Sequence, residues 1–354
     1  MKSNRVIEVD ILRVIAILGI VAGHIQFHVP GFENSNIVGM IELPISVCGL
    51  SLFFFLSGYS LMIKKPEFNR FNDWKSYSIK RMTRIYPLYW LALSVTFIIQ
   101  PGTYSEFTVL QLLMNISGLQ ILFPDPIVWF VSAILLFYFL FPFFIFFAKK
   151  IARPYTVSIF LVTLVIFIVL VVARIALISI DDRVFIYYWF FVVGIVLGKG
   201  TSISSIKASA RINVLLFLGI GLLIGYLYIR SMTTAFPEPM EQLTSSVSRL
   251  AAMFVIGVIG VLLAIQFTNS FKRYFTGCAY HLIERIAPST YSIYLFHSYF
   301  LSIAALLATE LSPVLVLFSV IIIGIPLAIL IPPYIQDAVG YAVSLMVGEP
   351  KSRA

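Results

Sequence analysis

The sequence predicts an all-α, polytopic integral membrane helical bundle with about ten transmembrane helices and with cytoplasmic N- and C-termini. Of the 354 residues, 60% are hydrophobic and only 12% are charged, whereas a soluble domain averages about 45–50% apolar and about 25% charged residues. A membrane span needs about 20 mostly apolar residues, and such runs recur along the whole chain. No hydrophilic stretch is long enough for an appended soluble domain, so residues 1–354 are expected to form one membrane domain.

Ten apolar runs have the composition of membrane spans. They cover residues 9–28, 38–63, 83–100, 127–148, 156–179, 184–198, 213–230, 250–267, 289–308 and 313–335. A further apolar run, 107–123, is short and contains polar residues such as Asn115 and Gln120. Charge is needed to decide whether this run crosses the membrane.

The positions of Lys and Arg predict the topology, because cytoplasmic loops of membrane proteins carry an excess of both. With ten spans and an inside N-terminus, the cytoplasmic segments contain 20 of the 25 Lys and Arg residues. Making 107–123 a full span would put Lys149, Lys150 and Arg153 outside. This segment is therefore expected to be re-entrant or to lie at the outer interface. The net charge of +9 follows from the same rule, so no nucleic-acid partner is expected.

The first span, RVIAILGIVAGH at its centre, carries two ionisable residues that are costly in hydrocarbon and are therefore functional candidates. In a continuous helix, Arg13 and His24 lie on one face, about 16 Å apart along the axis. One interpretation is structural: Arg13 pairs with Asp10, and His24 is a packed, hydrogen-bonded side chain. The other makes His24 a general base for a hydroxyl group.

The segment SIKRMTRIYPLYW holds the densest positive cluster of the chain. Lys80, Arg81 and Arg84 lie at positions i, i+1 and i+4, so Lys80 and Arg84 share a helix face. Ordinary positive-inside topology explains such a cluster. Alternatively, these side chains bind the phosphates of a cytosolic ligand, because guanidinium groups bind phosphate bidentately.

Two further segments combine small or polar residues with an apolar helix. Ser57 and Gly58 interrupt an aromatic-rich span, where they permit either close helix packing or a gap for a ligand. Ser289 lies at the expected start of a late span, which places His297 about 13 Å into the membrane; a buried, satisfied histidine is the alternative. With four histidines and spans poor in carboxylates, no metal site is expected.

Five segments together resemble the membrane acyltransferase-3 family. EVDILRVIAILGIVAGH is similar to its first-helix R-x10-H motif, and FFFLSGYSL to its second-span pattern. KRMTRIYPLYW resembles its RxxRIxPxYW segment, VWFVSAILLFYFLFPFF its fourth-span segment, and STYSIYLFH its late SYSIYLFH motif. The resemblance runs from about residue 7 to residue 335, with the five motifs in the family's order.

The resemblance implies an O-acyltransferase that moves an acyl group, most commonly acetyl from cytosolic acetyl-CoA, to a sugar hydroxyl. It implies that His24 is catalytic with Arg13 as its partner, and that Arg81 and Arg84 bind the donor. Lys80 is expected to join them because it belongs to the same basic cluster. Supporting roles are expected for Asp10, Ser57, Tyr86, Tyr138, Arg174, Ser289 and His297. The chain departs from the family at Ile134 and Leu135, where many members carry a glutamate pair.

The expected partners are acetyl-CoA as a substrate, a carbohydrate or lipid-linked glycan acceptor, and membrane lipid, with no permanently bound cofactor. The sequence leaves open whether the protein forms a homo-oligomer. The expected location is the cell membrane, most commonly the cytoplasmic membrane of a prokaryote. The competing interpretation is a transporter or exporter of a glycan or small polar substrate, which would use the same intramembrane Arg and His as a substrate path.

Overall fold

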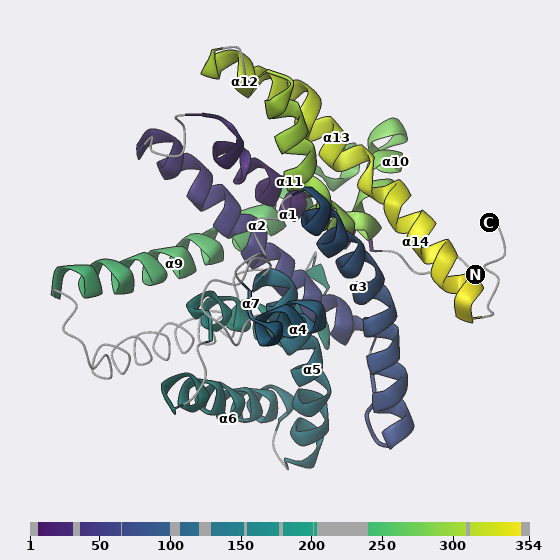
Figure 1. The fold of residues 1–354 in the computed structure, drawn as a ribbon. Helices are drawn as coiled ribbons and strands as arrows, with labels where there is room; N and C mark the ends of the chain where they lie inside the picture. Colours follow the sequence, from purple (N-terminus) through teal and green to yellow (C-terminus); the bar gives the residue numbers. More distant parts are fainter. Residues whose placement is uncertain are drawn as a thin grey trace. The chain divides into compact units, whose positions relative to one another are not determined.

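The computed structural model describes residues 6–30, 36–64, 66–99, 107–119, 129–151, 154–176, 180–200, 202–203, 240–308 and 312–347. Every regular element in this part of the chain is helical, and it contains no strand (Figure 1). The expected all-α class is therefore confirmed. The expected span 213–230 lies outside the described residues.

The helices before residue 200 are α1 (Ile7–Ala22), η1 (Ile25–His28), α2 (Asn36–Ile63), α3 (Phe71–Ile99), α4 (Val109–Ser117), α5 (Trp129–Lys150), α6 (Tyr155–Ala176) and α7 (Asp182–Gly198). The later ones are α9 (Met240–Phe271), η5 (Lys272–Tyr274), α10 (Gly277–Ile286), η6 (Ala287–Ser289), α11 (Thr290–Leu306), α12 (Pro313–Ser319), η7 (Val320–Gly324), α13 (Ile325–Leu330) and α14 (Pro332–Val347).

Six helical stretches in the described residues are long and apolar enough to cross a membrane. They are Pro44–Ile63, Phe71–Ile99, Trp129–Lys150, Tyr155–Ala173, Leu250–Tyr274 and Pro313–Met346. The chain is thus a multi-pass membrane protein. The count of ten spans and the cytoplasmic position of both termini stay predictions.

The α3 helix begins at Phe71 rather than near residue 83, so much of the loop expected between the spans 38–63 and 83–100 is helical. Its start is capped by Asp73, whose carboxylate accepts the backbone N–H groups of Asn69 (3.0 Å) and Arg70 (2.8 Å). Such a cap satisfies backbone donors just before the helix and fixes the point at which the chain enters it. Hydropathy marks only the apolar part of a helix, which is why the polar first turns were missed.

Two other boundaries differ from expectation. The first helix ends at Ala22, and the chain continues through Gly23 and His24 into the 3-10 helix η1. At the other end, helical structure was expected to stop at residue 335 but extends to Val347, because a further helix, α14, follows α13 from Pro332. The π-helical turn η7 interrupts the expected span between α12 and α13. For the segment 107–123, the described part is a nine-residue helix, α4, capped by Thr108 and Gly118.

The helices group into two compact units. The first comprises residues 1–53, 83–92 and 256–354, and the second comprises 54–82 and 93–255, so the long helices α2, α3 and α9 contribute to both. That residues 1–354 form one membrane domain stays a prediction.

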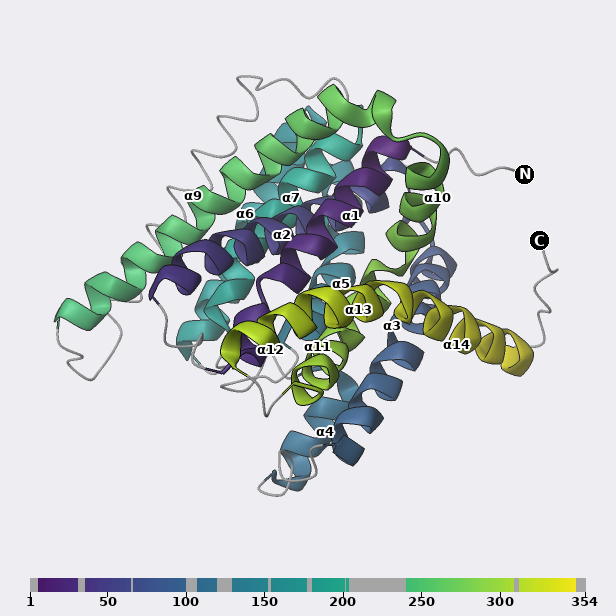
Figure 2. The ribbon, with the colours of Figure 1, turned by 90° about the horizontal axis from the view of Figure 1, so that it is seen from above.

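Within the first unit, α1 packs against α2 and α11. A Cβ added at Gly49 in α2 would lie 2.7 Å from the Ala16 carbonyl oxygen and 2.8 Å from the Ile20 nitrogen, so the α1 and α2 backbones approach closely. Small residues allow such approach in membrane helix pairs. The α1 helix also contacts α11 (Figures 1 and 2), which brings the chain's first and late motifs together.

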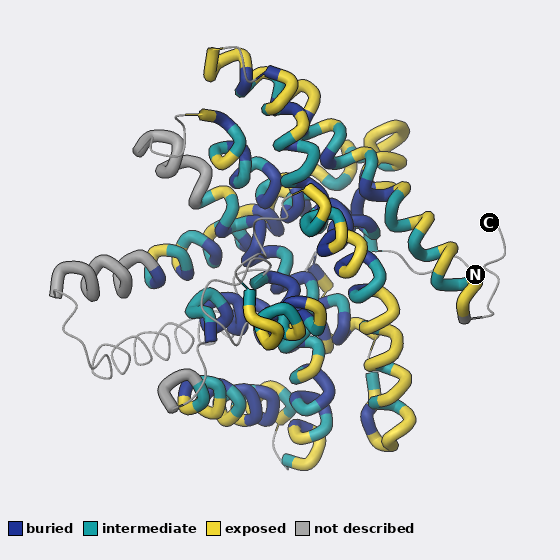
Figure 3. The backbone as a smooth tube through the Cα atoms, viewed as in Figure 1, coloured by how far each residue is buried: buried dark blue, intermediate teal, exposed yellow. Residues whose placement is uncertain are grey.

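Within the second unit, α2 and α7 pack through two glycines. A Cβ at Gly58 would collide with the Phe191 carbonyl, and one at Gly194 would collide with the Phe55 carbonyl. Beside this contact lies an aromatic core in which Phe54 packs against Phe130, Phe137 and Tyr187. The helix α7 is buried along nearly its whole length, whereas α6 has many exposed residues (Figure 3).

Candidate active site

His24 lies on the tightened turn that ends α1. Its backbone N–H donates to the Val21 carbonyl at 3.1 Å, three residues back instead of four. The continuous helix assumed from the spacing of Arg13 and His24 therefore ends at Ala22, before the histidine. The tight turn places the imidazole at the junction of α1 and η1.

The tautomer of His24 is set by one hydrogen bond. Nδ1 lies 2.7 Å from the carbonyl oxygen of Ile20. Because a carbonyl oxygen can only accept, Nδ1 carries the proton and donates it. In the neutral ring, Nε2 then has a free lone pair, which is the state that a general base requires.

His297, on α11, packs against His24. The two ring centroids are 4.8 Å apart, and the ring planes meet at 81°. His297 is only 4% exposed, and its Nδ1 donates to the Tyr294 carbonyl at 2.6 Å. Its Nε2 is buried and has no hydrogen-bond partner among the described residues. The tertiary fold thus joins two histidines that are far apart in the sequence.

Two polar side chains lie beside this histidine pair. The Nδ1 of His28 in η1 lies 3.2 Å from the Ser302 hydroxyl of α11. Ser302 was missed by sequence reasoning, although it lies five residues after His297 on the same helix. The hydroxyl and three imidazoles form a polar cluster where α11 contacts α1 and η1.

Arg13 is paired with Asp10, three residues earlier, with 3.6 Å between Nη1 and Oδ1. Asp10 is only 6% exposed, so the pair is partly withdrawn from solvent. The ion pair between Arg13 and Asp10 that the sequence suggested is therefore present in the structure. The two residues lie in the first turns of α1, and His24 follows that helix's other end.

Ser289 is buried and precedes α11 as expected, but its hydroxyl is used by the local backbone, where it donates to the Arg285 carbonyl at 3.4 Å. Tyr86 contacts Trp90 of its own helix, with centroids 5.2 Å apart. Ser57 is half-buried beside Gly58, where the close approach of α7 supports the helix-packing interpretation of this pair. The side chain of Arg174 lies outside the described residues.

The basic cluster of α3 is on a helix and not in a loop. Lys80 and Arg84 are exposed, whereas Arg81 is half-buried. The Arg81 guanidinium lies over the rings of Tyr77 (5.5 Å) and Tyr138 (5.6 Å), and cation–π contacts of this kind hold an arginine in a fixed direction. Arg81 Nε is buried without a hydrogen-bond partner among the described residues.

Lys80 and Arg81 line a pocket of about 300 Å³ in the second unit, together with Lys64. Two carboxylates also line it, but both have other tasks: Glu67 pairs with Lys149 at 3.4 Å, and Asp73 caps α3. The lining of the pocket thus contains three cationic side chains and two carboxylates. Arg84 belongs to the first unit and is not among the lining residues.

Sequence reasoning did not single out Lys64 or Tyr77 for this pocket. Tyr77 lies four residues before Arg81, the spacing that puts two side chains on one helix face, so the sequence did contain a signal. Its hydroxyl donates to the Tyr138 carbonyl at 3.1 Å, which fixes α3 to α5 at the pocket wall.

The apolar helices define the chain as a multi-pass membrane protein. Its histidine pair has the chemistry of a base, and its cationic pocket has the chemistry of an anion-binding site. A family model described as an acyltransferase domain matches residues 6–331, almost the whole chain. The chain therefore belongs to the membrane acyltransferase-3 family, as its motifs predicted. Comparisons with curated proteins and with solved structures gave no match.

Proposed function

We propose that this membrane acyltransferase moves an acetyl group from acetyl-CoA to a hydroxyl of a carbohydrate, with His24 as the general base. The observation that carries the proposal is the hydrogen bond from His24 Nδ1 to the Ile20 carbonyl. It leaves Nε2 unprotonated and fixes the direction of the ring, as a base acting on a hydroxyl requires.

In the proposed reaction, the acceptor O–H gives its proton to His24 Nε2 while its oxygen attacks the thioester carbonyl carbon. The C–S bond then breaks, and the coenzyme A sulfur takes the proton back from His24. A transient acyl-histidine is the covalent variant of this route. Because Ile134 and Leu135 replace the glutamates of many family members, the base here acts without a fourth-span carboxylate.

The donor's phosphates are assigned to the pocket lined by Lys64, Lys80 and Arg81. Its support is chemical: three cationic side chains line it, and the buried Arg81 Nε has no partner among the described residues. Arg81 is aimed by two tyrosine rings, so little rotamer entropy is lost when it binds an anion. Arg84 stays a candidate from the family motif alone.

Arg13 is assigned a supporting role for His24, with Asp10 orienting the guanidinium. The acceptor is proposed to be a surface carbohydrate or a lipid-linked glycan, and the location to be the cytoplasmic membrane of a prokaryote. These assignments rest on the family and on the apolar helices.

The test is acetyl transfer in membranes that contain His24→Ala, with radiolabelled acetyl-CoA and total surface glycan as acceptor. Removal of a general base is expected to lower the rate by about 10²–10⁴-fold. His281→Ala is the matched control, because the side chain of His281 is exposed on α10. Full activity of the His24 variant at normal expression would exclude the general-base role, and export of an unacetylated glycan by the wild type would favour a transporter.

A further inference from the structure

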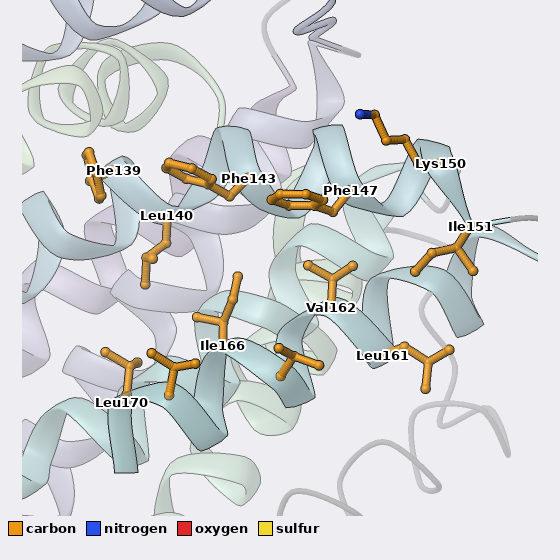
Figure 4. A pocket seen from close by; sticks show the side chains of 12 residues that line it. Phe139, Leu140, Phe143, Phe147, Lys150, Ile151, Leu161, Val162, Ile166 and Leu170 are labelled. Carbon is orange, nitrogen blue, oxygen red and sulfur yellow. The ribbon is translucent and has the colours of Figure 1, made fainter. Parts of the chain in front are cut away.

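A groove of about 490 Å³ runs between α5 and α6 within the second unit (Figure 4). On one side lie Phe139, Phe143 and Phe147 of α5, and on the other lie Val162 and Ile166 of α6. Lys150 stands at one end and is the one charged side chain among the described residues that line the groove. The groove shares no residue with the cationic pocket on α3.

The α5 wall of this groove consists of aromatic rings that pack against one another and against Trp74 of α3. The rings of Phe143 and Phe147 are nearly parallel, with an interplanar angle of 17°. Trp74 packs edge-on against Phe143, with 4.9 Å between centroids. Because its rings are already packed, this wall needs no rearrangement to receive a ligand.

The α6 wall is an open stripe of aliphatic side chains. Leu161, Val165 and Val169 recur every four residues and are 41%, 59% and 59% exposed. Both helices are long and apolar enough to span a membrane, so this exposed stripe faces hydrocarbon and not water. The two valines are also stiff at χ1, which favours a defined surface for a chain lying along it.

The length of the groove and the position of its one charged side chain fit a phospholipid in one leaflet of the bilayer. From Phe139 to Ile151 it follows α5 for about 18 Å, somewhat more than half of a ~30 Å hydrocarbon core. At its end Lys150 is exposed, with Nζ 4.2 Å above the Phe146 ring. Among the described residues no carboxylate pairs with Lys150, whereas the neighbouring Lys149 is paired with Glu67.

We propose that this groove binds one acyl chain of an anionic membrane phospholipid, whose phosphate contacts Lys150. The apolar walls account for the chain, and the cation at the end of the helix accounts for the negative headgroup. A free phosphate would leave the walls without a ligand, and a neutral lipid would leave Lys150 without one. The site is separate from the proposed acyl transfer, and neither proposal depends on the other.

The experiment uses the full-length protein in lipid nanodiscs that contain a trace of phospholipid with a photoreactive acyl chain. Phosphatidylglycerol and phosphatidylcholine probes are compared at equal mole fraction, and labelled peptides are mapped by mass spectrometry. The peptides covering 139–170 are expected to take up the anionic probe about fivefold more than the zwitterionic one, the ratio that one lysine near a headgroup supplies.

Two variants and two matched controls make the result decisive. Lys150→Gln is expected to bring the ratio to one, whereas Lys75→Gln, at another exposed lysine of the second unit, leaves it unchanged. Val165→Trp fills the groove and lowers labelling by both probes; Ile259→Trp, on the exposed face of α9, does not. An anionic preference that survives Lys150→Gln, or labelling of 139–170 no stronger than that of α9, would overturn the proposal.

Discussion

The imidazole rings of His24 and His297 meet edge to face, with their centroids 4.8 Å apart. Each Nδ1 donates to a backbone carbonyl three or four residues earlier in the chain, at Ile20 for His24 and at Tyr294 for His297, so each Nε2 is an acceptor. The Nε2 of His297 is buried without a partner in the described residues. An unpaired buried acceptor costs about 1–3 kcal/mol, and a second hydroxyl of a carbohydrate whose reacting hydroxyl is bound at His24 would supply the missing donor.

This relationship predicts opposite effects of His297→Phe on turnover and on stability. Phenylalanine keeps the edge contact with His24 and removes the unpaired acceptor. Acetyl transfer is expected to fall at least about 10-fold, since a buried hydrogen bond to substrate is worth roughly 1–3 kcal/mol. The Tm in detergent is expected to be equal or higher, measured by thermal unfolding. A lower Tm together with a proportionate activity loss would show that His297 is only a packing residue.

Arg81→Ala is predicted to raise the KM for acetyl-CoA by about 10–100-fold, the range that a charge-assisted hydrogen bond of roughly 1.5–3 kcal/mol supplies. Arg81→Lys should recover only part of this loss, because an ammonium cannot bind phosphate bidentately. Steady-state kinetics at varied acetyl-CoA measure the effect, with Lys75→Ala as control. If Arg81 serves only to join Tyr77 and Tyr138, the Tm will fall while KM stays constant.

Gly58→Ala and Gly194→Ala are each predicted to destabilise the second unit by about 1–3 kcal/mol, the usual cost of overpacking. Each new Cβ would collide with backbone atoms of the facing helix, at Phe191 and Phe55 respectively, so α2 and α7 must separate. Gly200→Ala is the control, since no heavy atom lies within 4 Å of its added Cβ. Equal thermal unfolding of all three variants in detergent would contradict this account of the helix contact.

The ion pair between Glu8 and Lys272, with 2.7 Å between Oε1 and Nζ, predicts a pH dependence of stability. Glu8 lies just before the expected first span. Its partial burial acts to raise its pKa, but the hydrogen bond and charge of Lys272 act against this, and the pKa lies below the ordinary value of 4.5. With a lowered folded pKa, the stabilisation is complete above pH ~4.5 and is lost as the pH falls through the folded value.

The wild type should therefore keep its stability advantage over Glu8→Gln down to about pH 4.5 and lose it as the pH falls further, so that the two converge in acid. Lys272→Met should remove most of the difference at every pH, because the residue that lowers the pKa is gone. Thermal unfolding in detergent across this pH range measures both effects. A difference that is independent of pH would exclude the ion pair as its cause.

Much of the helical layout could be read from hydropathy. The expected span 127–148 is α5 (Trp129–Lys150), and 289–308 is α11 (Thr290–Leu306). The predicted start of α3 was wrong because the first turns of this helix are polar. They are stabilised by the Asp73 cap, a local signal that hydropathy does not detect. The predicted end of α1 was wrong because a tightened turn after Ala22 leaves the hydrophobic pattern of the sequence unchanged.

By itself, the sequence determined the class of structure and the family. In lipid, a backbone must satisfy its own hydrogen bonds, so long apolar runs have to be helices, and ordered motifs carry the family. The sequence also contained the local contacts, such as Asp10 with Arg13, because three residues are one helical turn. Only the tertiary structure brought His297 to His24 and Tyr138 to Arg81, since helix packing between distant segments depends on side-chain shape, which no local pattern contains.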